Sequence, residues 1–170
     1  MTKTTFTSQQ MLARLVGFDT ISTKSNLELI HWVRDYLDSY GIASALIHDD
    51  TKNKANLHAV IGPEDKPGVV LSGHTDVVPV EGQAWDSDPF ALREHDGLLY
   101  ARGTCDMKGF IAVALAKLPD IVARHKAGKL SAPVHFAFSY DEELGCLGAH
   151  SLADTIAALP VKPQLCIVGE

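Results

Sequence analysis

Short apolar segments with the pattern of β-strands alternate along this chain with segments that have the spacing of helices. The strand-like segments are residues 43–48, 57–61, 69–72, 98–101, 134–139 and 165–168. The helix-like segments are residues 8–18, 25–40, 107–123 and 147–158. This alternation is typical of an α/β protein, so we expect a layered sheet of largely parallel strands flanked by helices.

Two of the helical segments carry boundary signals. Ser25 and Glu28 have the spacing of a capping box at the start of the second helix. Gly41 follows that helix, where a left-handed residue commonly ends one. Pro119 is expected to end or kink the helix over 107–123, because proline lacks the amide hydrogen that a helix interior needs.

Composition and charge argue against several classes of protein. The 170 residues, of which 46% are hydrophobic and 21% charged, suit one globular domain. The net charge of -6 argues against a nucleic-acid partner, which would favour a basic surface. Met1–Gln10 lacks the apolar stretch of a signal peptide, and no apolar run approaches the roughly 20 residues of a membrane helix. We therefore expect a cytoplasmic protein with no membrane partner.

Chemically reactive side chains follow three of the predicted strands at the point where each strand ends. They are His74 and Asp76 after 69–72, Glu142 and Glu143 after 134–139, and Glu170 after 165–168. Open α/β sheets bind ligands beyond the carboxyl ends of their strands, so these side chains are expected to converge. Asp106 would join them from the start of the helix over 107–123, where the helix dipole favours negative charge.

Several carboxylates around one imidazole repel one another unless a cation or protons neutralise them. A mixed set of oxygen and imidazole ligands suits zinc, cobalt or manganese better than magnesium or calcium. Asp106 could bridge two ions, and Glu142 would be the carboxylate that takes a proton from water. Asp76 would accept a hydrogen bond from the second ring nitrogen of His74 and fix its tautomer.

Each of these residues also has an ordinary structural explanation. Alone, His74 would be a packed or surface histidine, and Asp106 would be a helix N-cap. The acidic run over 141–143 would be a solvated turn, and Glu170 an ordinary terminal residue. Because all of these polar groups follow buried strands or begin a helix, the metal site is the better joint explanation.

The remaining histidines and the cysteines lack such neighbours. No ligand role is expected for His31, His48, His58, His95, His125, His135 or His150. The three cysteines, Cys105, Cys146 and Cys166, have neither disulfide-framework nor metal-binding spacing, so we expect reduced thiols.

Four ordered segments resemble motifs of the M20 metallopeptidase family. They are SGHTDVVP at 72–79, RGTCDMKG at 102–109 with DPF at 88–90 before it, SYDEELG at 139–145, and IVGE at 167–170. The resemblance covers nearly the whole chain in the family's order. It implies the catalytic fold of a zinc hydrolase with two zinc ions, or cobalt, in the complete enzyme.

The resemblance also implies a role for each candidate residue. His74 would bind one metal with Glu170, Glu143 would bind the other, Asp106 would bridge them, Glu142 would be the general base, and Asp76 would orient His74. A cis peptide bond is expected between Asp106 and Met107.

Within that family the chain is most similar to the bacterial acetylornithine deacetylase subfamily, through residues 54–63, 71–85, 106–110 and 138–152. The similarity implies a small N-acylated amino acid substrate and hydrolysis of N-acetyl-L-ornithine to L-ornithine and acetate, in arginine biosynthesis. The alternatives are another hydrolase of the family (a succinyl-diaminopimelate desuccinylase, an aminoacylase or a dipeptidase) and a metal-binding module without catalysis.

Enzymes of the family continue well beyond the motif that here ends at Glu170. Their further residues form a lid or dimerisation domain and the rest of the catalytic domain, including another histidine ligand. We therefore expect residues 1–170 to be the N-terminal part of the catalytic domain of a homodimeric enzyme. The isolated chain is expected either to lack the second metal or to hold it loosely, and to lose activity.

Overall fold

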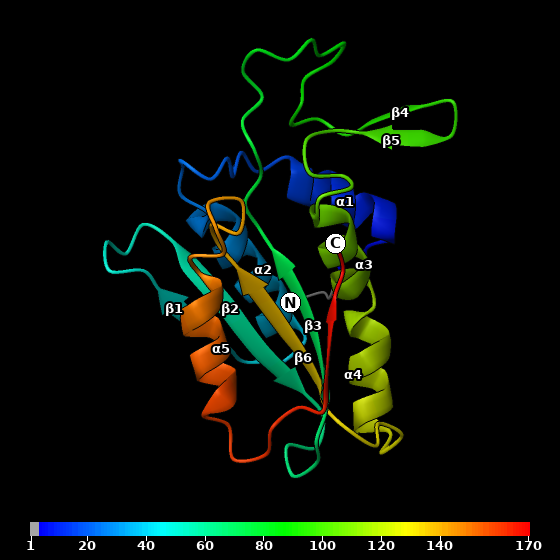
Figure 1. The fold of residues 1–170 in the computed structure, drawn as a ribbon. Coiled ribbons are helices and arrows are strands. Elements are labelled where there is room, and N and C mark those ends of the chain that lie inside the picture. The colour runs from blue at the N-terminus through cyan, green and yellow to red at the C-terminus, as the bar shows by residue number, and fades with distance from the viewer. Residues whose placement is uncertain (1–3) are drawn as a thin grey trace.

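The computed structural model describes residues 4–170, so the first three residues of Met1–Gln10, where no signal peptide is expected, lie outside it. Within the described range five strands form one sheet in the order β1-β2-β6-β3-β7 (Figure 1). They are β1 (Ser44–His48), β2 (Ala55–Ile61), β3 (Val69–His74), β6 (Val134–Ser139) and β7 (Leu165–Val168). A separate hairpin consists of β4 (Arg93–His95), which was not predicted, and β5 (Leu98–Tyr100).

The sheet is mixed, with most of its strands pointing the same way. β3 pairs in parallel with both β6 and β7, whereas β2 pairs antiparallel with β1 and β6. Four strands therefore share one direction and β2 alone opposes them. The expected α/β fold with largely parallel strands is confirmed, and the reversal at β2 is the feature that the sequence pattern did not predict.

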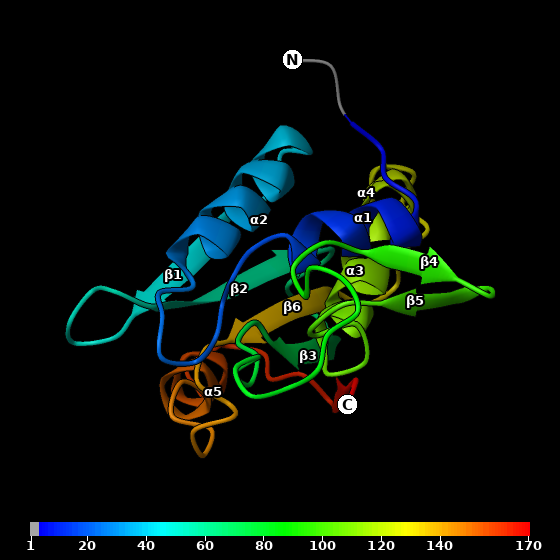
Figure 2. The same cartoon turned by 90° about the horizontal axis from the view of Figure 1, so that it is seen from above.

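Helices cover both faces of the sheet, as Figure 2 shows from above. The helices are α1 (Ser8–Val16), α2 (Leu27–Ser39), α3 (Lys108–Ala116), α4 (Leu118–Lys126) and α5 (Ala149–Ala157). The first four lie on one face, and their apolar side chains form one core with β2 and β6. α5 lies alone on the other face, over a small cluster formed by Val70, Ala137 and Leu152.

The predicted capping box at the start of α2 is wrong. The N-cap is Asn26, without a side-chain cap, and the Ser25 hydroxyl donates to the carbonyl of Asn53 at 2.5 Å while accepting from the Leu27 amide. Ser25 therefore ties α2 to the loop before β2. The other end is as predicted: Gly41 has φ +78°, a conformation that only glycine adopts without strain, and it ends the helix.

The helix predicted over 107–123 is broken in two. α3 ends at Ala116, Lys117 follows, and α4 begins at Leu118 with Pro119 in its first turn. Proline is well tolerated there because first-turn amides have no partner within the helix. Pro119 therefore lies in the first turn of the second helix, two residues after the break at Lys117.

The β7 edge of the sheet is the least covered part of the fold. Every residue of β7 is exposed, with Leu165 at 55% and Val168 at 58% of their full accessible surface. A cavity of about 470 Å³ lies between β7 and α5, lined by Ser72, Leu152 and Cys166 among others. None of the helices in residues 4–170 is long and apolar enough to cross a membrane.

Candidate metal centre

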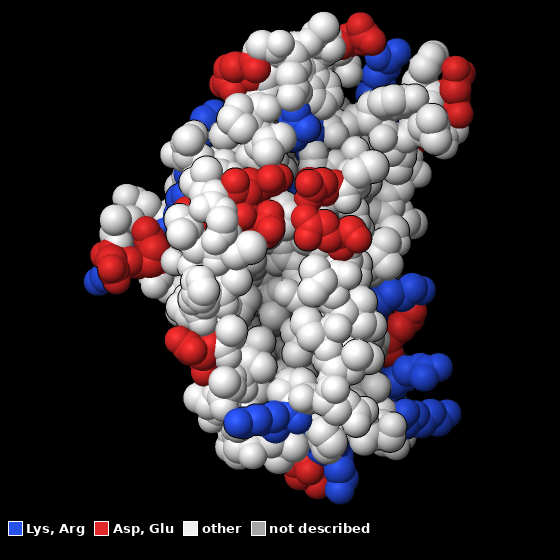
Figure 3. Space-filling model, in the orientation of Figure 1, with Lys and Arg blue, Asp and Glu red and all other residues white. Residues whose placement is uncertain are grey.

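The reactive side chains meet where β3, β6 and β7 end. His74 is the last residue of β3, and Glu142 and Glu170 lie in the segments that follow β6 and β7. Asp106 lies just before α3. Figure 3 shows acidic side chains gathered near the middle of this face of the molecule. The convergence expected from the direction of the strands is therefore observed.

Three of the predicted ligands lie within reach of one ion. One ligand atom each from His74, Asp106 and Glu170 can be chosen so that all three lie within 4.8 Å of one another. The His74 Nε2 atom is 2.9 Å from Asp106 Oδ1. One imidazole and two carboxylates are a ligand set that zinc accepts, with a fourth position left for water. The residues present therefore fit the metal that the sequence predicts, and the role of each remains a prediction.

His74 is held from its other side by Asp76, but mainly through the backbone. Its Nδ1 atom donates to the Asp76 carbonyl oxygen at 2.9 Å, whereas the nearest carboxylate oxygen is 3.5 Å away. Asp76 was predicted to be the acceptor, and the nearer of its oxygens is the backbone carbonyl. Either acceptor places the proton on Nδ1, so the Nε2 lone pair is available to a metal.

The electrostatics around His74 favour positive charge. Burial by itself would lower the pKa of His74, which is only 1% exposed, but Asp76 and Asp106 raise it to about 9. Burial would likewise raise the pKa of Asp76, yet the neighbouring His74 imidazole and the hydrogen bonds from the Ser22 hydroxyl and the Glu142 amide lower it. A cation at the Nε2 position would take the place of the proton that this environment attracts.

Glu142 lies beside the ligand group without belonging to it. Its Oε2 atom is 3.8 Å from His74 Nε2, and its Oε1 atom accepts a hydrogen bond from the Cys146 thiol at 3.3 Å. A carboxylate that is close to the ligands and free of them is where a general base would be placed.

Glu143 lies near Asp106 but outside the group of three. With Asp106 and Cys105 it lines a small cavity of about 120 Å³. Burial, then the charge of Asp106, raises the pKa of Glu143, as expected for carboxylates gathered without a counterion. The predicted role of Glu143 at a second ion stays a prediction.

Asp106 is not the N-cap of α3, which was its ordinary structural explanation. The N-cap of α3 is Met107, without a side-chain cap, and Asp106, with 53% of its side chain exposed, contacts His74 instead. The peptide bond between Asp106 and Met107 is cis, as the resemblance implies.

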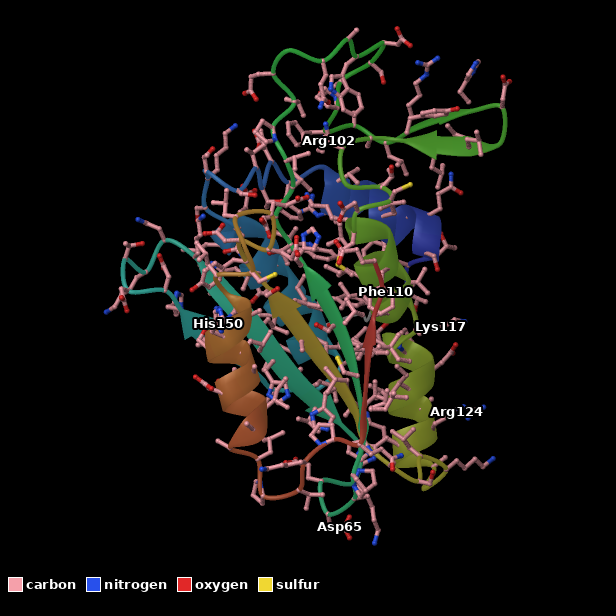
Figure 4. The ribbon with its side chains drawn as sticks, in the orientation of Figure 1. Asp65, Arg102, Phe110, Lys117, Arg124 and His150 are labelled. Carbon is pink, nitrogen blue, oxygen red and sulfur yellow. The ribbon has the colours of Figure 1, made fainter. Side chains whose placement is uncertain are left out.

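Glu170 is positioned by the contact between Gly169 and Phe110, a residue of α3 that lies beside the end of β7 in Figure 4. Any side chain at position 169 would collide with the Phe110 ring. The glycine therefore allows the chain after β7 to pass close to α3, and this brings Glu170 to Asp106.

Three supporting residues were missed by the sequence analysis. The Ser22 hydroxyl donates to Asp76, the Lys54 ammonium pairs with Asp141, and the buried Lys108 ammonium donates to the Phe18 carbonyl oxygen at 2.8 Å. Burial lowers the pKa of Lys108 to about 7. Lys108 lies in a motif and could have been noticed. Lys54 begins the segment 54–63 that carries the subfamily similarity, but Ser22 lies in a loop with no local pattern to mark it.

The histidines and cysteines that were not expected to be ligands do not belong to the group of three. His58 and His135 are buried and contact each other, with 3.2 Å between His58 Nε2 and His135 Nδ1. All three cysteines are exposed free thiols. Among residues 4–170, His74, Asp106 and Glu170 form the one group of such side chains close enough to share an ion.

Comparison with known proteins agrees with this geometry. The model of the peptidase family M20/M25/M40 matches residues 70–170. An acetylornithine deacetylase from Shigella sonnei is 39% identical over 148 residues, which cover 86% of this chain and 37% of that protein. The chain thus spans well under half the length of this relative.

Two solved structures share the fold. Human carnosine dipeptidase 1 matches with a TM-score of 0.78 and 22% identity, over 95% of this chain and 38% of its own. The M20 family metallo-carboxypeptidase Sso-CP2 from Sulfolobus solfataricus matches with a TM-score of 0.79 and 20% identity, over 96% and 37%. The fold, the ordered motifs and the sequence matches together show that the chain belongs to the M20/M25/M40 peptidase family of metal-dependent hydrolases, and that it is similar to acetylornithine deacetylase.

Proposed function

We propose that this chain is part of a metal-dependent amide hydrolase that converts N-acetyl-L-ornithine to L-ornithine and acetate. The observation that carries the hydrolase assignment is the group of His74, Asp106 and Glu170 ligand atoms within 4.8 Å, with Glu142 beside it. The substrate rests on the 39% identity to an acetylornithine deacetylase. The reaction would serve arginine biosynthesis.

His74, Asp106 and Glu170 would hold one zinc ion, and Asp106 with Glu143 would contribute to a second. Cobalt is the alternative metal, since sites of this kind accept both. When bound, the metal supplies Lewis acidity that polarises the amide carbonyl and acidifies water.

The protein residues would then hold and transfer the protons. His74 keeps its proton on Nδ1, bonded to the Asp76 carbonyl oxygen, and so presents a neutral Nε2. Glu142 would take a proton from the attacking water and deliver it to the amine nitrogen as the carbon–nitrogen bond breaks. Acetate and a free amino group would leave.

The chain would form the N-terminal part of the catalytic domain. The supporting observation is that the match to the Shigella relative covers 86% of this chain but 37% of that protein. The whole protein would add the remaining catalytic residues and a dimerisation domain, and it would act as a homodimer on a small N-acylated amino acid.

The test compares turnover by the whole zinc-loaded protein of four substrates: N-acetyl-L-ornithine, N-acetylmethionine, N-succinyl-diaminopimelate and a dipeptide. A clear preference for N-acetyl-L-ornithine is expected, with loss of turnover on chelation and recovery on adding zinc. Preference for another substrate would reassign the enzyme within the family. Bound metal with no turnover of any substrate would mean a binding module.

Glu142→Gln separates a catalytic site from a binding site. The variant should bind zinc normally while kcat falls by about 10²–10⁴, the usual contribution of a general base. Near-normal turnover would remove Glu142 from that role.

A further inference from the structure

The turn that carries Glu142 and Glu143 depends on Asp76 for its backbone hydrogen bonds. Asp76 Oδ1 accepts the Glu142 amide at 3.1 Å, and Oδ2 accepts the Glu143 amide at 3.3 Å. These residues follow β6 outside any helix or strand. One buried carboxylate therefore holds two consecutive amides of the segment that bears the proposed base.

Ser22 holds that carboxylate in turn. Its buried hydroxyl donates to Asp76 Oδ2 at 2.7 Å, and its amide donates to the Val77 carbonyl oxygen at 3.0 Å. The Ser22 carbonyl oxygen accepts from the Lys54 ammonium, which also pairs with Asp141 at 2.5 Å. Ser22 is thus linked to the turn twice, through Asp76 and through Lys54.

His74 has a second acceptor on Asp76 besides the carboxylate. Its Nδ1 atom already donates to the Asp76 carbonyl oxygen at 2.9 Å, and the carboxylate is 3.5 Å away. A substitution at Asp76 removes the carboxylate but leaves the carbonyl oxygen in the backbone. The ring therefore keeps an acceptor that fixes its tautomer, whereas the two amides lose the acceptor that they have among residues 4–170.

We propose that the Asp76 carboxylate, held by Ser22, is a positioning group for the Glu142–Glu143 turn, in addition to its interaction with His74. The catalytic importance of this positioning rests on the proposed function, in which Glu142 is the base. The contacts themselves do not depend on it.

Amide hydrogen exchange in this chain, followed by NMR, tests the proposal directly. In Asp76→Ala the Glu142 and Glu143 amides should exchange roughly tenfold faster, the loss expected for one ordinary hydrogen bond each. Amides of β3 and β6 should keep their protection. Asp76→Asn retains one side-chain oxygen, so it should restore slow exchange at one of the two amides.

Two buried hydroxyls provide a matched pair of variants. Ser22→Ala removes a donor to Asp76 and should speed exchange at Glu142 and Glu143 by roughly threefold, a fraction of one hydrogen bond. Thr20→Val removes a hydroxyl from the same segment, but that hydroxyl donates to the Thr75 carbonyl oxygen, so these two amides should not change.

Unchanged exchange at Glu142 and Glu143 in Asp76→Ala, with the strands still protected, would overturn the proposal. Equal effects of Ser22→Ala and Thr20→Val would also overturn it, because they would show general loosening. If Asp76→Ala fails to fold, the comparison of the two hydroxyl variants decides.

Zinc titration separates this proposal from the proposed function. In Asp76→Ala the zinc affinity should weaken less than threefold while kcat of the whole enzyme falls at least tenfold; a role confined to His74 would instead weaken zinc binding. If the unaltered whole enzyme binds no zinc, the proposed function fails, and the exchange measurement still decides whether Asp76 holds the turn.

Discussion

The face of the sheet under α1–α4 and the face under α5 are built on the same strands but are closed to different degrees. On the first face β2 and β6 contribute Leu57, Phe136 and Phe138, all fully buried, to a large core. On the second, the core is Val70, Ala137 and Leu152, and a cavity of about 470 Å³ opens beside β7.

The candidate metal centre lies where these two regions meet, and its ligands differ in the same way. His74 is buried and fixed on both ring nitrogens, whereas Glu170 is exposed and follows a strand that is exposed along its length. Packing therefore decides which ligand is rigid before a metal arrives, although both ligands lie in equally clear sequence motifs.

Matched leucines measure the difference between the two faces. Leu57→Ala should lower the free energy of unfolding by about 4 kcal/mol, because it leaves a void inside the large core. Leu152→Ala should cost about 2 kcal/mol, since Leu152 already borders the cavity beside α5. Urea denaturation of both variants is the measurement, and equal losses would mean that the α5 face is closed in solution.

Acid should lower the free energy of unfolding through the buried histidine pair His58 and His135. Burial, then the charge of His135, lowers the pKa of His58 to about 4, below the value of about 6.5 for an unfolded chain. Since the unfolded chain takes up a proton that the folded protein resists, this stability is complete above about pH 6.5. It should decline by about 3 kcal/mol as the pH falls toward 4.

His58→Leu should flatten this part of the pH profile, measured from urea midpoints at pH 7 and pH 5. The control variant is His150→Gln, which removes an exposed imidazole on α5 outside the buried histidine pair. A profile in which His58→Leu matches the unaltered chain would assign the acid sensitivity to other groups.

Zinc affinity should distinguish the rigid ligand from the exposed one. His74→Ala is expected to weaken binding about 100-fold and Glu170→Ala about tenfold, because water can replace an exposed carboxylate more easily than a fixed imidazole. Calorimetric titration of this chain checks both, with Glu81→Ala as a control outside the site. Equal losses would show that β7 holds Glu170 as firmly as β3 holds His74.

The smallest effect is expected on β7 itself. Ile167 is 44% exposed, so Ile167→Thr should change the free energy of unfolding by less than about 0.5 kcal/mol. A loss of several times that size would mean that β7 is covered in solution. Thermal melts at two protein concentrations would then show whether a second copy covers it.

The sequence was sufficient to predict the sheet and the convergence of its ligands. Strands of one direction place their carboxyl ends at one edge, so His74, Glu142 and Glu170 could be brought together without coordinates. The reversal of β2 escaped prediction, because an apolar run such as Ala55–Ile61 carries no information about its direction.

The sequence pattern could not predict the supporting contacts of the site. Ser22 reaches Asp76 across 54 positions of the chain, and nothing near Ser22 marks it. The choice between the carbonyl and the carboxylate of Asp76 as partner of His74 depends on differences of about half an ångström. Motifs identify which residues meet, whereas backbone geometry decides which of their atoms do.

The order β6-β3-β7 also sets when the centre can first exist during synthesis. β3 lies between two strands that are made later, and Glu170 follows His74 by almost a hundred residues. At roughly 5–20 residues per second, the ribosome takes about 5–20 s to reach Glu170 after His74. His74 and then Asp106 are synthesised before Glu170, so a nascent chain could acquire the group of three only once β7 has joined the sheet.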